Sequence, residues 1–122
     1  MTIVLWILQV LLGSFYVYHG WMMLNPPAQV QPMLSYIHEL PAGLRRFIGA
    51  LEIPGGIGLI LPPVVRILPI LTPLAAVGLV IVMAPAAVYH LTRREYPNVL
   101  FNLVLLALAA FVAYGRFALS PF

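Results

Sequence analysis

The stretch that decides the fold is Phe47–Pro62, FIGALEIPGGIGLILP, an apolar run that holds a single carboxylate, Glu52. Gly49 lies three residues before Glu52 and Gly56 lies four residues after it, so all three fall on one face of a helix. Small residues on such a face let a second helix approach closely. A carboxylate that faces lipid near the bilayer centre costs about 2.5–3.5 kcal/mol. The pattern therefore predicts a membrane helix whose Glu52 face packs against other helices.

The composition of the whole chain also indicates that lipid is the solvent. Hydrophobic residues make up 63% of the 122 residues and charged residues only 7%, whereas a soluble domain carries about 25% charged residues. The arginines that give the net charge of +3 stand beside apolar runs and do not form the basic stripe of a nucleic-acid-binding protein. The absence of cysteine excludes disulfides and thiolate metal ligands. We therefore expect a lipid bilayer, and no nucleic acid, as a partner.

Four apolar runs predict an all-α membrane protein, a single transmembrane domain of residues 1–122 folded as an antiparallel bundle of four helices. Prolines end the first two runs, at Asn25-Pro26-Pro27 and at Pro62-Pro63, because proline cannot continue the helical hydrogen-bond ladder. The first run lacks a basic n-region and an A-x-A cleavage site, so we expect a retained span rather than a signal peptide. The expected spans are residues 3–24, 41–61, 67–91 and 99–119.

The connector between the first two spans, Ala28–Leu40, carries apolar residues at helical spacing with polar residues between them. These apolar residues are Met33, Leu34, Ile37 and Leu40. The spacing predicts either a short helix that lies in the headgroup region or a structured loop, and leaves both readings open.

The arginines indicate an orientation in the membrane. Four spans place both termini on one side, together with Arg66 and Arg116. The loops on the other side carry Arg45, Arg46, Arg93 and Arg94. Because positive residues favour the cytoplasmic side, we expect these loops in the cytoplasm and both termini outside.

Antiparallel threading brings polar side chains from all four spans into the half of the bilayer nearest these cytoplasmic loops. Glu52 is expected there as a proton acceptor or hydrogen-bond anchor, with His19 or His90 as its partner. The candidate ligand-binding residues are Glu52, His19, His90, Asn102, Tyr18, Tyr89, Arg45 and Arg46. Such a pocket suits a small polar head with an apolar tail, such as a quinone. The other half is almost wholly apolar apart from Gln9, Thr72, Arg66 and Arg116.

The same residues allow a second interpretation, in which an interhelical hydrogen-bond cluster only fixes the register of the bundle. A haem held by His19 and His90 is not predicted, because two histidines without a CxxCH motif are a common chance pattern. A metal site of His19, Glu52 and His90 has suitable ligand types, but no HExxH-like spacing supports it. We therefore predict no metal site.

Several stretches together resemble the DoxX-like family of small bacterial membrane proteins. They are FIGALEIPGGIGLILPP from Phe47 and LAAVGLVIVMAPAAVYHL from Leu74, with the most specific positions at Gly49-x-x-Glu52 and around His90. The resemblance covers about Gly13 to Arg116. It implies a four-helix bundle in the bacterial inner membrane and a link to quinone-coupled or thiol redox systems, in which relatives serve as a small membrane subunit.

The sequence thus predicts a redox-associated membrane subunit, or a binder of a quinone-like or lipidic ligand, with no independent catalytic activity. The alternative is a structural or assembly subunit that packs against other membrane proteins or copies of itself, as the many small residues would allow. A transporter half is a third interpretation, but four spans need an oligomer to enclose a path, and no inverted repeat is present.

Overall fold

The computed structural model describes all 122 residues, and it is helical throughout with no strand. Four helices are long and apolar enough to cross a membrane, so the predicted all-α membrane fold is confirmed. The long helices are α1 (Thr2–Leu24), α3 (Ala42–Val65), α4 (Leu71–Thr92) and α5 (Tyr96–Tyr114). The shorter elements are a 3-10 turn (Pro32–Leu34), α2 (Tyr36–Glu39) and a π-helical turn (Gly115–Leu119) that extends α5.

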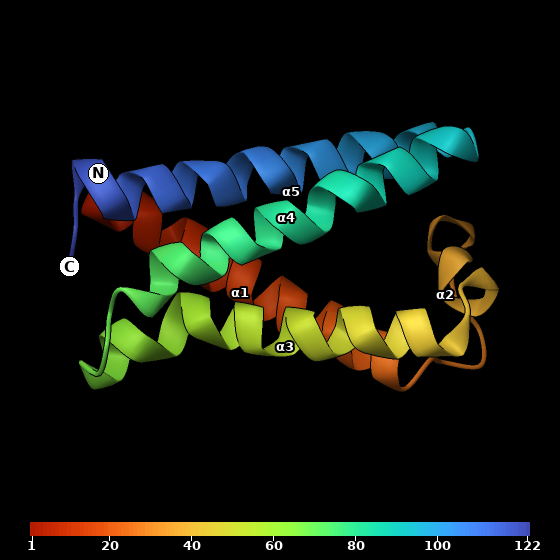
Figure 1. Cartoon of the computed structure of the whole chain (residues 1–122), viewed down its shortest axis with the longest axis horizontal. Coiled ribbons are helices and arrows are strands. Elements are labelled where there is room, and N and C mark those ends of the chain that lie inside the picture. The colour runs from red at the N-terminus through yellow and green to blue at the C-terminus, as the bar shows by residue number, and fades with distance from the viewer.

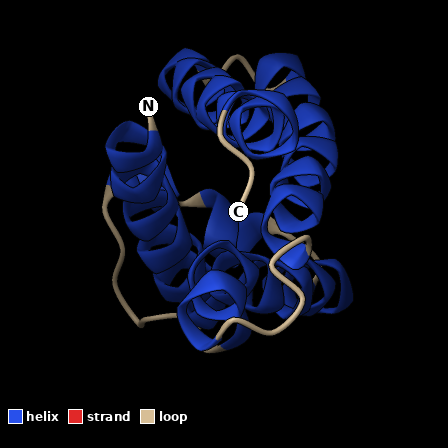
Figure 2. Ribbon diagram, turned by 90° about the vertical axis from the view of Figure 1, so that its left-hand side faces the viewer, coloured by secondary structure: helices blue, strands red, loops and turns tan.

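The long helices form two antiparallel pairs, α1 with α3 and α4 with α5 (Figure 1). The pairs lie close together at the end that holds both termini and separate toward the other end, where α2 lies between them. The view from the termini end shows the helices arranged around a common interior (Figure 2). We call these two ends the termini end and the α2 end.

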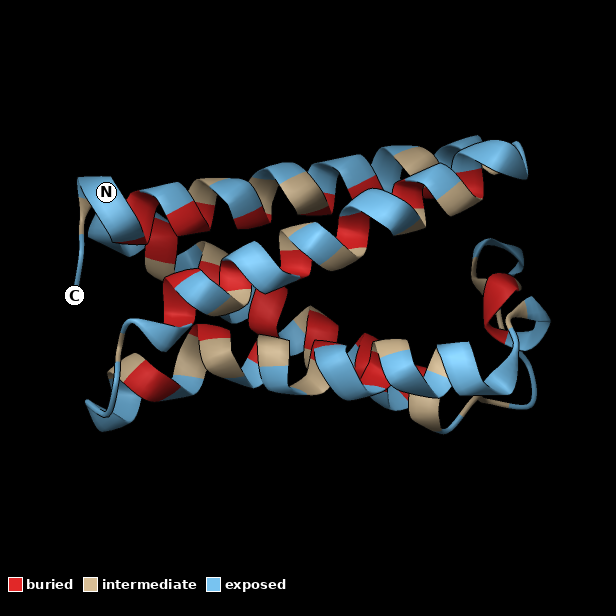
Figure 3. Cartoon of the chain, in the orientation of Figure 1, coloured by how far each residue is buried: buried red, intermediate tan, exposed pale blue.

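The core lies between the two pairs, and the residues buried there face inward from every long helix (Figure 3). Its main cluster consists of Leu12, Tyr16, Leu59, Ala76, Leu79, Met83, Leu105, Ala109, Val112 and Ala113. The outer faces carry exposed aliphatic side chains such as Ile3 and Ile81, as expected for contact with lipid.

Glycines bring the backbones of α1 and α3 together at two crossings on either side of Glu52. A Cβ atom built on Gly56 would lie 2.6 Å from the carbonyl oxygen of Gly13, and one on Gly49 would lie 2.7 Å from that of Gly20. No larger residue fits at either distance, so the glycine face expected around Glu52 is the face that contacts α1.

The prediction that the second span ends at Pro62-Pro63 is wrong, because α3 continues to Val65. Pro62 has no N–H to donate to the carbonyl oxygen of Gly58 one turn earlier. Thr72 Oγ1 of α4 donates to that oxygen instead, at 2.8 Å. A side chain of a neighbouring helix thus replaces the missing backbone donor, and the helix is not interrupted.

The same replacement occurs at the next residue. Pro63 leaves the carbonyl oxygen of Leu59 without its helical donor, and Gln9 Nε2 of α1 donates to it at 2.8 Å. The helix then ends at Arg66, which adopts a left-handed conformation with φ 58° and lies in the turn that leads to α4. The third span consequently begins at Leu71 and not at residue 67, where the sequence predicted its start.

The connector forms both a 3-10 turn and the four-residue helix α2. It packs against the helices of the bundle, because Ile37 is fully buried and Tyr36 is nearly so. Both side chains pack in a cluster with Met22 and Met23 at the end of α1. The connector is therefore part of the interior at the α2 end.

Candidate functional site

Glu52 lies in the interior of the bundle with 1% of its surface exposed, and it does not face lipid. His19 Nδ1 lies 2.5 Å from Glu52 Oε2, at the level set by the glycine crossings of α1 and α3. His19 Nε2 in turn lies 2.5 Å from the hydroxyl of Tyr36 in α2. A continuous hydrogen-bonded chain thus joins Glu52, His19 and Tyr36.

The chain has two consistent arrangements of its protons. With Glu52 ionised, His19 Nδ1–H donates to the carboxylate, and Nε2 of the neutral imidazole accepts from the Tyr36 hydroxyl. With Glu52 protonated, its O–H donates to Nδ1, and Nε2–H donates to the Tyr36 oxygen. The second arrangement holds one proton more than the first. To pass to it, Nδ1 gives its proton to Glu52, Nε2 takes the Tyr36 proton, and the Tyr36 oxygen takes up a proton from outside the chain.

Tyr36 connects this chain to the outer part of the α2 end. Burial raises the pKa of the Tyr36 hydroxyl above its ordinary range, and the nearby carboxylates of Glu52 and Glu95 raise it further. Tyr36 therefore stays protonated and able to donate. Its ring also packs edge-on against His90, with ring centroids 4.9 Å apart.

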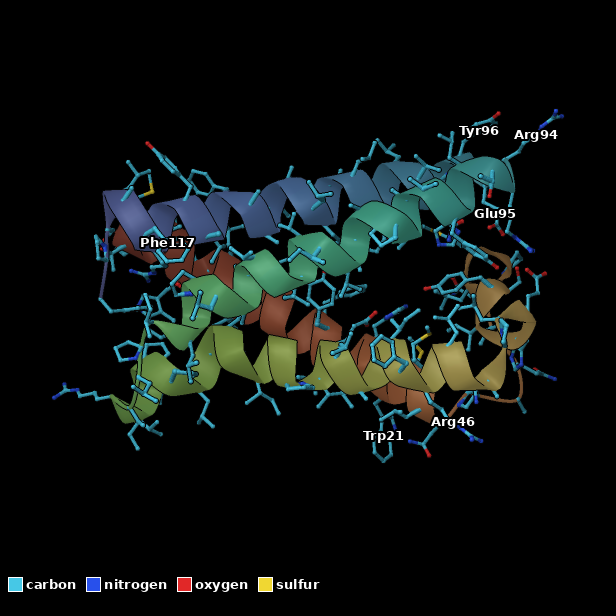
Figure 4. The ribbon with its side chains drawn as sticks, viewed as in Figure 1. Trp21, Arg46, Arg94, Glu95, Tyr96 and Phe117 are labelled. Carbon is cyan, nitrogen blue, oxygen red and sulfur yellow. The ribbon has the colours of Figure 1, made fainter.

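His90 does not pair with Glu52. Its Nδ1 lies 2.9 Å from Glu95 Oε1 in the loop after α4, and Arg93 Nε donates to the same oxygen at 3.2 Å. Arg93 also forms an ion pair with Glu39 at the end of α2. These contacts hold the connector over the interior. Glu95, labelled in Figure 4, lies on the side of the α4–α5 loop that faces the connector. Asn98 of α5 adds a further tie, because its Nδ2 donates to the backbone carbonyl of Met33 at 2.8 Å.

Several polar atoms at the α2 end and in the interior near it have no partner within the protein, Arg45 Nε among them. Tyr16 is fully buried and its hydroxyl forms no hydrogen bond, and the same holds for Nδ2 of Asn102, which is 9% exposed. Glu52 uses only Oε2 toward His19, so Oε1 remains an acceptor without a protein donor. Buried polar groups are normally paired, so these atoms suggest a ligand with polar groups of its own.

The unpartnered atoms lie close to the hydrogen-bonded chain. Tyr16 precedes His19 by one helical turn, on the same face of α1. The neighbouring rings of Phe15 and Phe101 are in contact, with centroids 5.4 Å apart. This contact sets α1 and α5 in register and brings Asn102 to the level of Tyr16.

The remaining predicted residues lie at the edge of this interior, as Arg45 and Tyr89 do, or on the outer surface. Tyr18 is 63% exposed on the outer face of α1. Arg46 points away from the bundle beside Trp21 (Figure 4), and neither it nor the half-buried Arg45 bonds to Glu52. Tyr89 is half-buried, and its ring packs against Arg93 with the guanidinium carbon 5.3 Å from the ring centroid.

An open apolar groove of about 940 Å³ lies on the outer face of α1 and α3 rather than in the interior. Its lining includes Gly13, Ser14, Val17, Trp21, Ile57 and Ile60. No group of three or more histidine or acidic side chains is arranged to hold a metal ion.

Sequence reasoning missed Tyr36, Tyr16 and Glu95. Tyr16 has a usable signal, because its spacing of three residues from His19 places it on the same helical face. Tyr36 and Glu95 have no such signal, because they lie in connectors whose path the helical periodicity does not determine.

These features define a class: a small multi-pass membrane protein with a buried acid–imidazole–phenol chain under a folded connector. The sequence matches the model of the DoxX-like family over residues 7–112, which is most of the chain, so this protein belongs to the DoxX-like family. Neither the curated proteins nor the solved structures contain a match.

Proposed function

We propose that this protein binds the polar head of a quinone-like ligand in the interior of the α2 end. The observation that carries the proposal is the set of unpartnered buried atoms beside Glu52. The Tyr16 hydroxyl and Asn102 Nδ2 are donors suited to a quinone carbonyl oxygen, and Glu52 Oε1 is an acceptor suited to a hydroquinone hydroxyl. An apolar tail would leave between the helix pairs toward lipid.

The chain from Glu52 to Tyr36 supports a role in proton supply to that ligand. Reduction of a quinone consumes two protons and two electrons, so a proton path from the connector to the ligand would serve it. The electrons would come from a partner enzyme, and this protein would act as its small membrane subunit without independent catalytic activity.

The experiment compares two tyrosines of α1 that differ in burial. Tyr16→Phe removes an interior hydroxyl and should weaken binding of a short-chain benzoquinone about fivefold, the equivalent of one lost hydrogen bond. Tyr18→Phe removes a hydroxyl from the lipid-facing side of the same helix and should leave the affinity unchanged. Both are measured by calorimetric titration in detergent.

Glu52→Gln and Asn102→Leu extend the same test. Each should weaken quinone binding, while the variants keep their helical circular dichroism. Equal affinity in wild type, Tyr16→Phe and Glu52→Gln would rule out this site.

We also propose that the protein resides in the bacterial inner membrane, with the loops before α3 and before α5 in the cytoplasm. Support comes from four arginines on this side against two on the other. Cysteines introduced at Ala28 and Ser120, probed with an impermeant thiol reagent in whole cells, test this. Only the cysteine at position 120 should react.

A structural or assembly role is the second candidate, and the outer groove of α1 and α3 favours it. Small residues such as Gly13 and Ser14 line a surface into which a helix of a second copy could pack. A bulky substitution, Ser14→Trp, should then shift a purified oligomer toward monomer. A wild-type protein that is monomeric in detergent and in nanodiscs would exclude self-assembly.

A further inference from the structure

Arg116 at the termini end is a buried cation without a counter-ion. It lies in the π-helical turn after α5 and is only 3% exposed. The three glutamates of the chain are Glu39, Glu52 and Glu95. All three belong to the α2 end or to the interior near it, and none pairs with Arg116. A guanidinium withdrawn from water normally has an acidic or anionic partner.

The contacts of Arg116 use only part of its hydrogen-bonding capacity. Nε donates to Gln9 Oε1 at 2.7 Å, and Nη1 donates to the backbone oxygen of Ser120 at 2.9 Å. Nη2 is buried and has no partner. The guanidinium lies between two rings, 4.0 Å from the centroid of Phe122 and 5.7 Å from that of Trp6.

The other arginines differ from Arg116 in this respect. Arg93 has two carboxylate partners, and Arg46, Arg66 and Arg94 are exposed. Arg45 Nε also lacks a partner, but Arg45 as a whole is only half-buried. Arg116 is the one arginine that is buried, and its unpartnered nitrogen is Nη2.

The surroundings of Arg116 indicate the class of ligand. Trp6, which flanks the guanidinium, also lines an apolar groove of about 340 Å³ that continues along α1 over Ile7, Val10 and Leu11. Both chain termini lie at this end, next to the bilayer surface that a spanning bundle would have (Figure 2). A cation at the headgroup level and an adjacent apolar groove match the two parts of a phospholipid.

We infer that Arg116 binds the phosphate of an anionic phospholipid, with one acyl chain in the groove over Val10. A phosphate oxygen accepts from Nη2, the one guanidinium nitrogen that forms no hydrogen bond within the protein. The Phe122 ring lies against the guanidinium and moves aside when the lipid enters. Lipid with net negative charge is favoured over zwitterionic lipid because no acidic side chain lies at this end to pair with the cation.

The experiment uses the full chain in detergent, titrated with dioleoyl phosphatidylglycerol or dioleoyl phosphatidylcholine and read out by native mass spectrometry. Wild type should bind phosphatidylglycerol roughly tenfold more tightly than phosphatidylcholine, and Arg116→Gln should lose that preference. Arg66→Gln removes an exposed arginine from the same end and should keep it. Equal losses in both variants, or in neither, would overturn the assignment.

A second variant keeps the test decisive if Arg116→Gln does not fold. Val10→Trp fills the acyl groove from an exposed position, so the bundle should fold and the phosphatidylglycerol preference should fall. The control is Val4→Trp, which is equally exposed but outside the groove. Retained preference in folded Val10→Trp would contradict the inference. Displacement of the lipid by equimolar inorganic phosphate would instead identify a site for free anions and reject the lipid.

Discussion

The two ends of the bundle use buried polar side chains in different ways. At the termini end, Gln9 and Thr72 donate to carbonyl oxygens that Pro63 and Pro62 leave free, so they complete the backbone of α3. At the α2 end, Glu52, His19 and Tyr36 bind one another, and no backbone group requires them.

This difference separates structural polar groups from candidate functional ones better than burial does. Gln9 and Glu52 are both almost completely buried, and both join α1 to α3. Gln9 replaces a donor that proline removed, whereas Glu52 introduces an acid and leaves one of its oxygens unpartnered. A buried polar group that replaces a missing backbone donor is explained by the fold. A buried polar group without such a structural task is a candidate for binding or catalysis.

The glycine crossings lie between these two regions and should give the largest effect. Gly56→Leu places a side chain 2.6 Å from the carbonyl oxygen of Gly13, which cannot move without separating α1 from α3. We expect the free energy of unfolding to fall by about 3 kcal/mol, measured by thermal unfolding in detergent. Gly78→Leu is the control, because a Cβ there meets nothing within 4 Å. A Gly56→Leu protein as stable as the control would mean that α1 and α3 do not cross here.

Gln9→Leu tests the structural half of the comparison and should give the next largest effect. It leaves the Leu59 carbonyl oxygen and Arg116 Nε without their partners. We expect a loss of about 1–3 kcal/mol in stability with no change in quinone affinity. Thr2→Ala removes an exposed hydroxyl of the same helix and should change stability by less than about 0.5 kcal/mol. If Gln9→Leu weakened quinone binding at unchanged stability, the division between the two ends would fail.

The sequence was sufficient to predict the depth that Glu52 and His19 share, although it left open whether His19 or His90 is the partner of Glu52. Helical rise and antiparallel threading placed His19 and Glu52 at one depth, and the structure brings them to 2.5 Å. The spacing of Gly49 and Gly56 predicted the face on which they meet. These arguments work because long membrane helices have few ways to pack.

The features of the site that the sequence did not predict depend on connectors, which have no helical periodicity, and on contacts between helices. Tyr36 enters the site from a connector whose hydrophobic spacing fitted a headgroup helix equally well. Its position is fixed by packing with Met22 and Met23 and by the hydrogen bond to His19, and neither contact can be read from that spacing. His90 has the predicted depth, but the loop after α4 turns Glu95 back toward it, and so it pairs there instead. The extension of α3 was missed because a side-chain donor from another helix cannot be read from local proline rules.

Tyr36→Phe should give the smallest effect at neutral pH and a distinctive one in alkali. Loss of its hydrogen bond to His19 should cost about 1 kcal/mol at pH 7. Because the pKa of Tyr36 is raised in the folded protein, the unfolded chain releases this proton first as the pH rises. Above a pH of roughly 10, the free energy of unfolding of the wild type should therefore fall by up to about 1.4 kcal/mol per pH unit. Tyr36→Phe lacks this hydroxyl and should not show the fall.

The two stabilities should thus converge about one unit above the ordinary tyrosine pKa, as measured by denaturation between pH 7 and pH 11 in an alkyl maltoside. Tyr96→Phe is the matched control, because it removes an exposed hydroxyl at the same end and should follow the wild-type profile. A constant difference between wild type and Tyr36→Phe across this range would show that the Tyr36 hydroxyl is not withdrawn from water. In that case the connector would not shield the hydrogen-bonded chain of Glu52, His19 and Tyr36 from water. The α2 end would then lack the buried polar chain that distinguishes it from the termini end.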